Sequence, residues 1–237
     1  MGDSLTADIG DHGWAKLFSD LHGIRYKNLA VIAGNNKTQI LKLQHYLLSN
    51  EYQPDDIFFW EINATHRPNI LVNKKMTING QTIEAVLKDK APSKFTYLVD
   101  IENIFCTTTD YGVILCHPEL KDERAAFDPY KLQHVDEFIL QDVLTYINLL
   151  VKSGHAVIVA LGWEDAIAEN HKETFLQYLN KTGAYIVNEA MLDWCIDQGL
   201  PLNDDNHPNQ TVSTLLWAKT HLSSVLNEIQ QRTYNGT

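Results

Sequence analysis

The stretch His155-Ala-Val-Ile-Val-Ala-Leu161 decides the fold class, because an apolar run of this length is typical of a strand buried on both faces. It follows residues 132–151, which have the periodicity of an amphipathic helix, across the turn-forming pair Ser153-Gly154. A helix that leads through a short turn into such a strand is the repeating unit of a parallel sheet covered by helices.

The alternation of strand and helix continues on both sides of this stretch. The other predicted elements are strands over 28–33, 57–62 and 184–188 and helices over 38–48, 172–179 and 211–229. The sequence therefore predicts an α/β protein, a three-layer α/β/α sandwich with a parallel sheet, in a single domain spanning residues 1–237.

Residues 66–128 interrupt this alternation. Asn79-Gly80 lies between short β-prone runs and predicts a hairpin, because this dipeptide suits a type I′ turn. Residues 95–101 and 111–116 are further strand candidates. We interpret the segment as a β-rich insertion. It could shape a substrate pocket at the carboxyl end of the sheet, or serve as a structural lobe or an oligomer contact.

Composition excludes several function classes. The net charge of −11 argues against a nucleic-acid partner, because phosphate backbones attract basic surfaces. No apolar run approaches the roughly 20 residues of a membrane span. The histidines and cysteines show no metal-ligand spacing, so we expect neither a metal nor another cofactor.

The cysteines and the start of the sequence bear on the compartment. Cys106, Cys116 and Cys195 are best explained as buried thiols in a reducing compartment, although the first two could pair across a hairpin. The chain starts directly at Met1 without a secretory signal. These features predict a cytoplasmic protein.

Two short stretches near the two ends of the chain carry the groups of a hydrolytic site. They are Gly2-Asp-Ser-Leu-Thr6, with Ser4 at its centre, and Leu202-Asn-Asp-Asp-Asn-His-Pro-Asn209, in which Asp204 precedes His207. A serine hydroxyl becomes an effective nucleophile when a base takes its proton and a carboxylate orients that base. We therefore expect the fold to bring the ends of the chain together.

The chain resembles the SGNH hydrolases, the GDSL esterase/lipase family. The stretch around Ser4 resembles the first motif block of that family, and residues 28–34, which end in Gly34, resemble the second. Glu61-Ile-Asn-Ala64 stands at the place of the third block, and residues 204–209 resemble the last one. The matching blocks span nearly the whole chain apart from the insertion.

The resemblance implies a role for each residue. Ser4 would attack an ester carbonyl, His207 would act as the general base, and Asp204 would orient the imidazole. The oxyanion would be held by the backbone N–H groups of Ser4 and Gly34 and by the side-chain amide of Asn63. A donor of this kind lowers the barrier by roughly 3 kcal/mol.

The sequence departs from the family pattern in several places, including the glycine common after His-Pro-Asn, near whose place this chain has Val212. The third block usually reads Gly-x-Asn-Asp, whereas this chain has Glu61 and Ala64 at its ends. Asp205 stands next to Asp204 and is an alternative partner for the histidine. Finally, a serine presented by a strand-to-helix turn needs a strand before it, so we expect residues upstream of Met1, which would also hide any signal peptide.

Each residue also has an ordinary structural interpretation. Ser4 and Asn209 could cap helices, His207 could cap a turn, and Gly34 and Asn63 could be turn formers. Their joint order and spacing favour a site over these separate interpretations.

The functional hypothesis is hydrolysis of a carboxylic ester through an acyl-serine intermediate, with a small-molecule or carbohydrate ester such as an O-acetyl sugar as substrate. The alternatives within the same fold are a lysophospholipase, a thioesterase and an acyltransferase. An alternative of another class is a non-catalytic binding module in which the third block has degraded.

Overall fold

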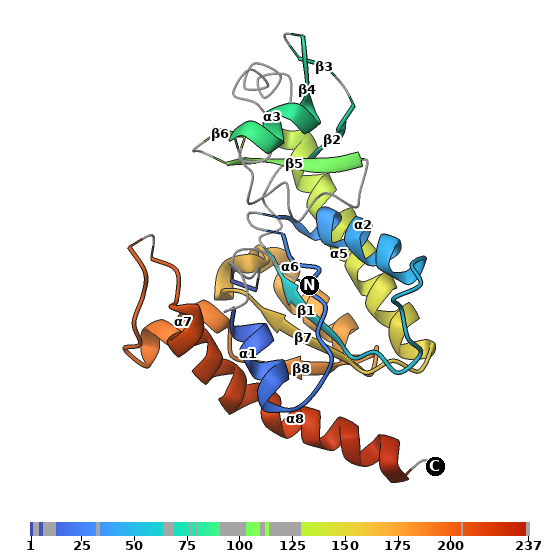
Figure 1. Ribbon diagram of the computed structural model, residues 1–237, viewed down its shortest axis with the longest axis vertical. Coiled ribbons are helices and arrows are strands. Elements are labelled where there is room, and N and C mark those ends of the chain that lie inside the picture. Colours follow the sequence, from blue (N-terminus) through green and yellow to red (C-terminus); the bar gives the residue numbers. More distant parts are fainter. Residues whose placement is uncertain are drawn as a thin grey trace.

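The computed structural model describes residues 1, 5–6, 13–31, 34–63, 69–75, 77–78, 80–90, 103–109, 112–113, 129–204 and 206–235. Over these residues the chain is a mixed α/β protein with a small parallel sheet and flanking helices (Figure 1). The predicted α/β class is therefore confirmed.

The parallel sheet has the strand order β1–β7–β8. Strand β1 (Phe58–Ile62) pairs with β7 (Val157–Leu161) in the register Phe58↔Val157, and β7 pairs with β8 (Tyr185–Val187). All five residues of β7 are buried, as its continuous apolar sequence predicts. The predicted strands over 57–62, 155–161 and 184–188 are thus confirmed.

Helices cover both faces of this sheet. The side chains of successive strand residues point to opposite faces, so each face has its own set of packed residues. Trp60 and Val159 pack on one face, and Ile158 and Ala160 pack on the other. The first face is covered by α2 (Asn36–Leu47), α5 (Pro129–Lys152) and α6 (Glu169–Asn180). The second face is covered by α1 (Trp14–Leu21), α7 (Met191–Asp197) and α8 (Leu215–Asn235).

The predicted strand over 28–33 is wrong for residues 28–31, which form no β-ladder. Leu29, Ala30 and Val31 are buried, so their apolar character reports burial correctly. Met1, and not residues 28–31, pairs with the edge of β1 that faces away from β7. Its amino group donates to Phe59 O at 2.6 Å, and Glu61 N–H donates to Met1 O at 2.9 Å. This is the hydrogen-bond pattern of a parallel ladder.

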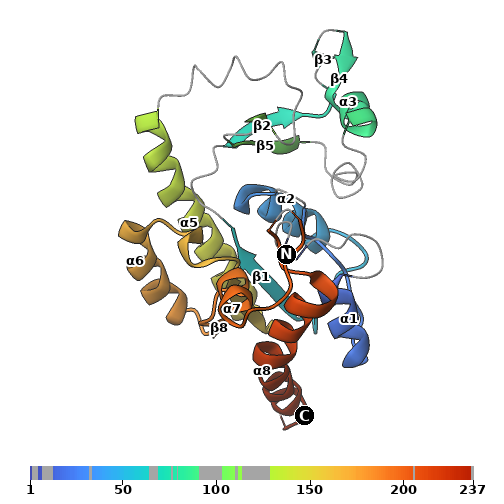
Figure 2. The ribbon, with the colours of Figure 1, turned by 90° about the vertical axis from the view of Figure 1, so that its left-hand side faces the viewer.

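The described residues in the middle of the chain include antiparallel strands and the helix α3 (Ile83–Lys90). Strand β2 (Asn69–Asn73) pairs with β5 (Asn103–Thr109), which also pairs with β6 (Gly112–Val113). In both ribbon views these strands lie beyond α2, on the side away from α8 (Figure 1, Figure 2).

The predicted hairpin at Asn79-Gly80 is confirmed by the pairing of β3 (Thr77–Ile78) with β4 (Gln81–Thr82). Gly80 has a φ of 80°, a conformation that glycine adopts without a steric penalty. Helix α3 (Ile83–Lys90) follows the hairpin directly. The candidate strand 95–101 lies outside the described residues, as does most of 111–116.

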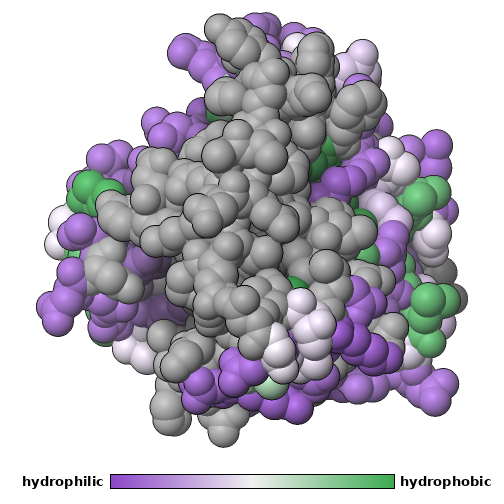
Figure 3. Space-filling view, turned by 90° about the horizontal axis from the view of Figure 1, so that it is seen from above, coloured by the Kyte–Doolittle hydropathy of each residue, from purple (hydrophilic) through white to green (hydrophobic). Residues whose placement is uncertain are grey.

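On the face seen in Figure 3, the described residues are mainly hydrophilic. The apolar residues visible on this face stand apart from one another, and single exposed apolar residues are normal on soluble domains. No helix within the described ranges has both the length and the apolarity needed to cross a bilayer.

Candidate functional site

Asn63 and Gly34, two residues assigned to an oxyanion hole, lie together beyond the carboxyl end of β1. The Asn63 Nδ2 atom lies 3.4 Å from the carbonyl oxygen of Gly34. Asn36, in the first turn of α2, holds Asn63 through two hydrogen bonds: its Nδ2 donates to Asn63 O at 3.0 Å, and its Oδ1 accepts from Asn63 N–H at 3.2 Å. The structure therefore positions the Asn63 side chain against the turn that contains Gly34.

Asn63 and Asn36 sit in a polar region that is closed to solvent. Asn63 is 0 % exposed, and its Oδ1 atom has no hydrogen-bond partner within the described part of the chain. Helix α2 begins beside it, with the Asn35 side chain accepting from Thr38 N–H at 2.9 Å. An amide of this kind is either satisfied on ligand binding or is a local cost to stability.

Gly34 closes a tight turn. Its N–H donates to Val31 O at 2.7 Å, and a Cβ atom at this position would lie 2.7 Å from the same oxygen. Only glycine fits such an approach without a backbone shift. To bind an oxyanion as the resemblance implies, this N–H must be shared with the substrate oxygen or released by the turn.

Ser4 lies outside the described residues, and the two residues that follow it are held firmly. Leu5 and Thr6 are both 3 % exposed. The indole N–H of Trp14 donates to Leu5 O at 2.8 Å, and Asn28 Nδ2 donates to Thr6 O at 3.4 Å.

Glu61, which departs from the family pattern, contacts this same segment. Its carboxylate accepts a hydrogen bond from the hydroxyl of Thr6, and the residue is 0 % exposed. Glu61 lies on β1, two residues before Asn63, which follows directly after the strand. Sequence reasoning missed this contact, because it treated Glu61 as a departure without assigning it a partner.

His207 and Asp204 lie in a loop that is closed on itself. Asn203 N–H donates to His207 O at 2.7 Å, and Leu202 forms a bridge with Pro208. Asp204 is exposed and His207 is half-buried, while the alternative carboxylate, Asp205, lies outside the described residues. The loop stands at the left of the sheet in Figure 1, between α7 and α8.

The two ends of the chain share one core. Trp14, at the start of α1, packs edge-on against Trp217 of α8 with ring centroids 6.1 Å apart. Leu5 belongs to the same buried cluster, and α1 also contacts the π-helical turn η3 (Gln210–Thr214) that follows the His207 loop. The segments that follow Ser4 and His207 are therefore joined through α1.

Two other titratable groups lie at this core, the partly buried His221 and the buried Cys195. Burial lowers the pKa of His221 below its usual value near 6.5, against the opposing effect of Glu189, whose carboxylate lies 3.6 Å from Nδ1. Burial raises the pKa of the Cys195 thiol to about 11, and this thiol is free. The prediction of a buried thiol is confirmed for Cys195. Within the described ranges, no group of three or more His, Cys, Asp or Glu residues is placed to hold a metal ion.

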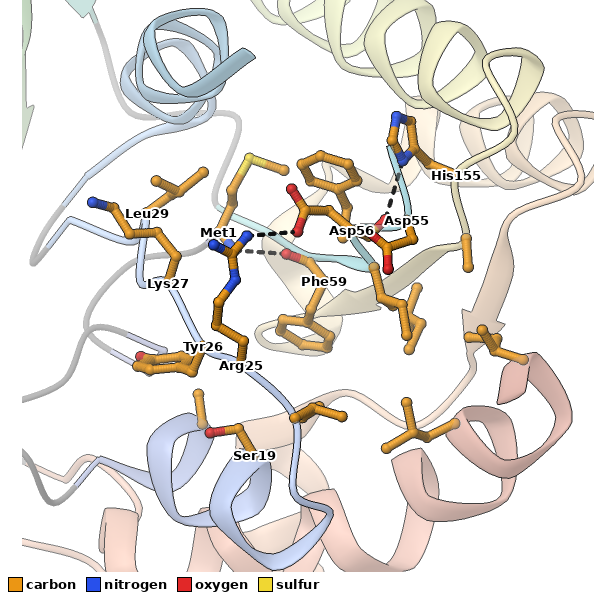
Figure 4. Close-up of a pocket in the computed structure, with 18 of the residues that line it drawn as sticks. Met1, Ser19, Arg25, Tyr26, Lys27, Leu29, Asp55, Asp56, Phe59 and His155 are labelled. Carbon is orange, nitrogen blue, oxygen red and sulfur yellow. Dashed lines mark hydrogen bonds and ion pairs between the residues drawn. The ribbon is translucent and has the colours of Figure 1, made fainter. Parts of the chain in front are cut away.

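A cavity of about 1160 Å³ opens beside β1 (Figure 4). It lies toward the amino end of that strand, near Phe59 and His155, and its lining includes neither Gly34 nor Asn63. The cavity is therefore distinct from the oxyanion region described above.

A polar network closes one end of the cavity. Asp56 accepts a hydrogen bond from the Tyr46 hydroxyl at 2.6 Å and pairs with Arg25 at 3.3 Å, and its carbonyl lies 3.1 Å from His155 Nδ1. Burial, together with the Asp56 carboxylate, raises the pKa of Tyr46 to about 12.

Comparison with protein-family models, curated proteins and solved structures found no match to this chain.

Proposed function

We propose that the chain is a serine ester hydrolase of the SGNH type, which cleaves carboxylic esters through an acyl-serine intermediate. In this proposal Ser4 is the nucleophile, His207 the general base and Asp204 the residue that orients it. Asn63, with the N–H groups of Ser4 and Gly34, binds the oxyanion. The parallel sheet would be the core of an SGNH fold, and residues 66–128 a β-rich insertion beside the site.

The approach of Asn63 Nδ2 to the Gly34 turn, at 3.4 Å, is the observation that carries this proposal. Residues 29 positions apart in the sequence meet at the carboxyl end of a parallel strand. This edge of an open α/β sheet is where such proteins usually place their ligands. The Thr6 hydroxyl donates to the carboxylate of Glu61, two residues before Asn63, so Thr6 contacts the same end of β1.

Ester hydrolysis follows from these groups by ordinary chemistry. Attack by the Ser4 hydroxyl on the carbonyl carbon transfers its proton to His207, and the carbonyl oxygen becomes the oxyanion. His207 then protonates the departing alcohol, leaving an acyl-serine. Water attacks the acyl-serine with His207 again as base, which releases the acid and restores Ser4. A sugar hydroxyl in place of water would make the same enzyme an acyltransferase.

The test is turnover of p-nitrophenyl acetate and of a panel of O-acetylated sugars, lysophospholipids and thioesters. We expect Ser4→Ala and His207→Ala each to lower kcat/KM by about 10³-fold or more, because triad members act as a unit. Ser153→Ala and His45→Ala, at exposed positions, are matched controls that should keep full activity. Circular dichroism verifies that each variant is folded.

A non-catalytic binding module is the second candidate, favoured by the engagement of Gly34 N–H with Val31 O. A donor already bonded within the protein is less available to an oxyanion. Wild-type protein that is folded but inactive on the whole panel would support this candidate. Ser4→Ala with wild-type turnover would contradict Ser4 as the nucleophile.

A further inference from the structure

A side chain of α2 takes the place of a neighbouring strand just beyond the carboxyl end of β1. The ladder between β1 and β7 ends at the pair Ile62↔Leu161, and Asn63 is the next residue. Both backbone groups of Asn63 bond to Asn36: Nδ2 donates to Asn63 O at 3.0 Å, and Oδ1 accepts from Asn63 N–H at 3.2 Å. A primary amide supplies one donor group and one acceptor, as a residue of a neighbouring strand would.

Asn36 is itself in a fixed position. It is 1 % exposed and is the first residue of α2. The Asn35 side chain caps that helix by accepting from Thr38 N–H at 2.9 Å, which fixes the backbone of the first turn. Asn36 therefore holds the backbone of Asn63 against the start of a capped helix.

The side chain of Asn63, by contrast, is held weakly. Its Nδ2 lies 3.4 Å from Gly34 O, beyond the usual length of an N–H···O hydrogen bond, and its Oδ1 has no partner among the residues that the structure describes. The direction of this side chain thus depends mainly on its backbone. A long contact at Nδ2 also leaves that donor available, because little is lost when the contact is released.

We propose that Asn36 is a positioning residue, which acts through Asn63 by directing its side-chain amide toward the developing oxyanion. This role rests on the esterase function proposed above. An oxyanion forms in the transition state and is absent from the bound substrate, so a loss of positioning should lower kcat and leave KM nearly unchanged.

The test is a double-mutant cycle on the turnover of p-nitrophenyl acetate. We expect Asn36→Ala to lower kcat by about 10- to 100-fold, with KM within about twofold of wild type. In an Asn63→Ala background the same substitution should lower kcat by less than about twofold, because the group that Asn36 positions is already absent. If alanine prevents folding, Asn36→Ser should give the same pattern, since its side chain is polar but too short to bridge both backbone groups.

Gln39→Ala is the matched control. Gln39 lies on the same helix, is 0 % exposed, and its Nε2 donates to the backbone carbonyl of Glu61 at 3.2 Å. Losing this bond should lower the urea midpoint of unfolding much as Asn36→Ala does, because each variant removes a buried hydrogen bond between α2 and the β1 segment. It leaves the backbone of Asn63 bonded, so kcat should stay within about threefold of wild type.

The outcomes separate the role of Asn36 from the esterase itself. Equal losses of kcat in Asn36→Ala and Gln39→Ala, or an undiminished effect of Asn36→Ala in the Asn63→Ala background, would overturn the proposal. Ser4-dependent turnover that Asn36→Ala leaves unchanged would overturn the role of Asn36 alone. Turnover that does not depend on Ser4 would overturn the proposed esterase and this role together.

Discussion

At the scale of single residues, Glu61 shows how a departure from a motif can be structural. A carboxylate that is 0 % exposed is costly unless hydrogen bonds satisfy it, and the Thr6 hydroxyl supplies one. The contact joins the segment after Ser4 to the carboxyl-terminal end of β1. Glu61 therefore holds the segment after Ser4 beside the candidate site.

Thr6→Val tests this contact, because valine keeps the shape of threonine and removes the hydroxyl. We expect a loss of about 1–3 kcal/mol in the free energy of unfolding, since a donor to a buried carboxylate disappears. Thr6→Ser keeps the hydroxyl and should lose much less. Urea denaturation of the three proteins measures the difference, and equal losses in both variants would show that the hydroxyl contributes nothing.

His221 gives the molecule a predictable pH dependence. Its Nε2 is buried without a hydrogen-bond partner in the described part of the chain, and its ring packs against Trp194 and Trp217. Because burial lowers its pKa in the folded state, the unfolded chain binds more protons below about pH 6.5. This group therefore costs stability as the pH falls from 6.5 toward the lower folded pKa.

The corresponding variant is His221→Phe, which keeps an aromatic ring and removes the titratable group. We expect the free energy of unfolding of the wild type to decrease between about pH 7 and pH 5 more steeply than that of the variant. Exposed His45→Phe is the matched control and should keep the wild-type slope. Denaturant titrations at several pH values decide it, and parallel slopes for wild type and His221→Phe would contradict the assignment.

At the scale of elements, Asn209 determines where the last helical segment begins. Its side chain accepts hydrogen bonds from the N–H groups of Thr211 and Val212, both at 3.1 Å. This is the arrangement of an N-cap, and the structural interpretation of Asn209 is thereby confirmed. The helix predicted over 211–229 begins with the π-helical turn η3 and continues as α8.

Asn209→Ala should destabilise the protein by about 1 kcal/mol, because two helix N–H groups lose their acceptor. Asn209→Asp retains the acceptor and should stay close to wild type. Thermal denaturation of both variants gives the comparison. If alanine and aspartate behave alike, the cap does not contribute to stability.

The elements themselves were predictable to different degrees. Strands β1, β7 and β8 follow from continuous apolar runs, and α2, α5, α6 and most of α8 from helical periodicity. The short helix α7, seven residues long, and strand β5 were not predicted, since short or threonine-rich segments carry weak periodicity. Residues 28–31 carry the pattern of a buried strand and form none, because a ladder needs a neighbour and none of the described strands pairs with them.

At the scale of the whole molecule, two hydrophobic clusters on opposite faces of one sheet hold the fold together. Leu43 of α2 belongs to one cluster, and Leu222 of α8 belongs to the other. The two clusters are connected by the strands of the sheet, whose side chains alternate between its two faces. We therefore expect the two clusters to unfold together.

Leu43→Ala and Leu222→Ala should each cost about 2–5 kcal/mol, with a single unfolding transition, and the double variant should be additive within about 0.5 kcal/mol. Leu48→Ala, at a position that is 89 % exposed, is the control and should change stability by less than about 0.5 kcal/mol. Fluorescence and circular dichroism should give coincident curves. Separate transitions for the two probes would show that the faces unfold independently.

The contacts of the candidate site were also predictable to different degrees. The approach of Gly34 and Asn63 was expected from the resemblance, because both stand at the ends of predicted strands. The hydrogen bond between Thr6 and Glu61 was not, since it joins residues 55 positions apart and depends on how the segment after Ser4 lies across the sheet. Whether His207 serves Ser4 stays a prediction.

By itself, the sequence determined the class of the protein: apolar runs and helical periodicity are local properties, and together they require a buried sheet covered by helices. Only the tertiary structure decided which backbone edges are paired, which carboxylate accepts the hydrogen bond from Thr6, and that a cavity is lined both by residues 24–29 and by β1. These are matters of long-range hydrogen bonding, and no local pattern specifies the partner of a strand edge or of a buried polar group.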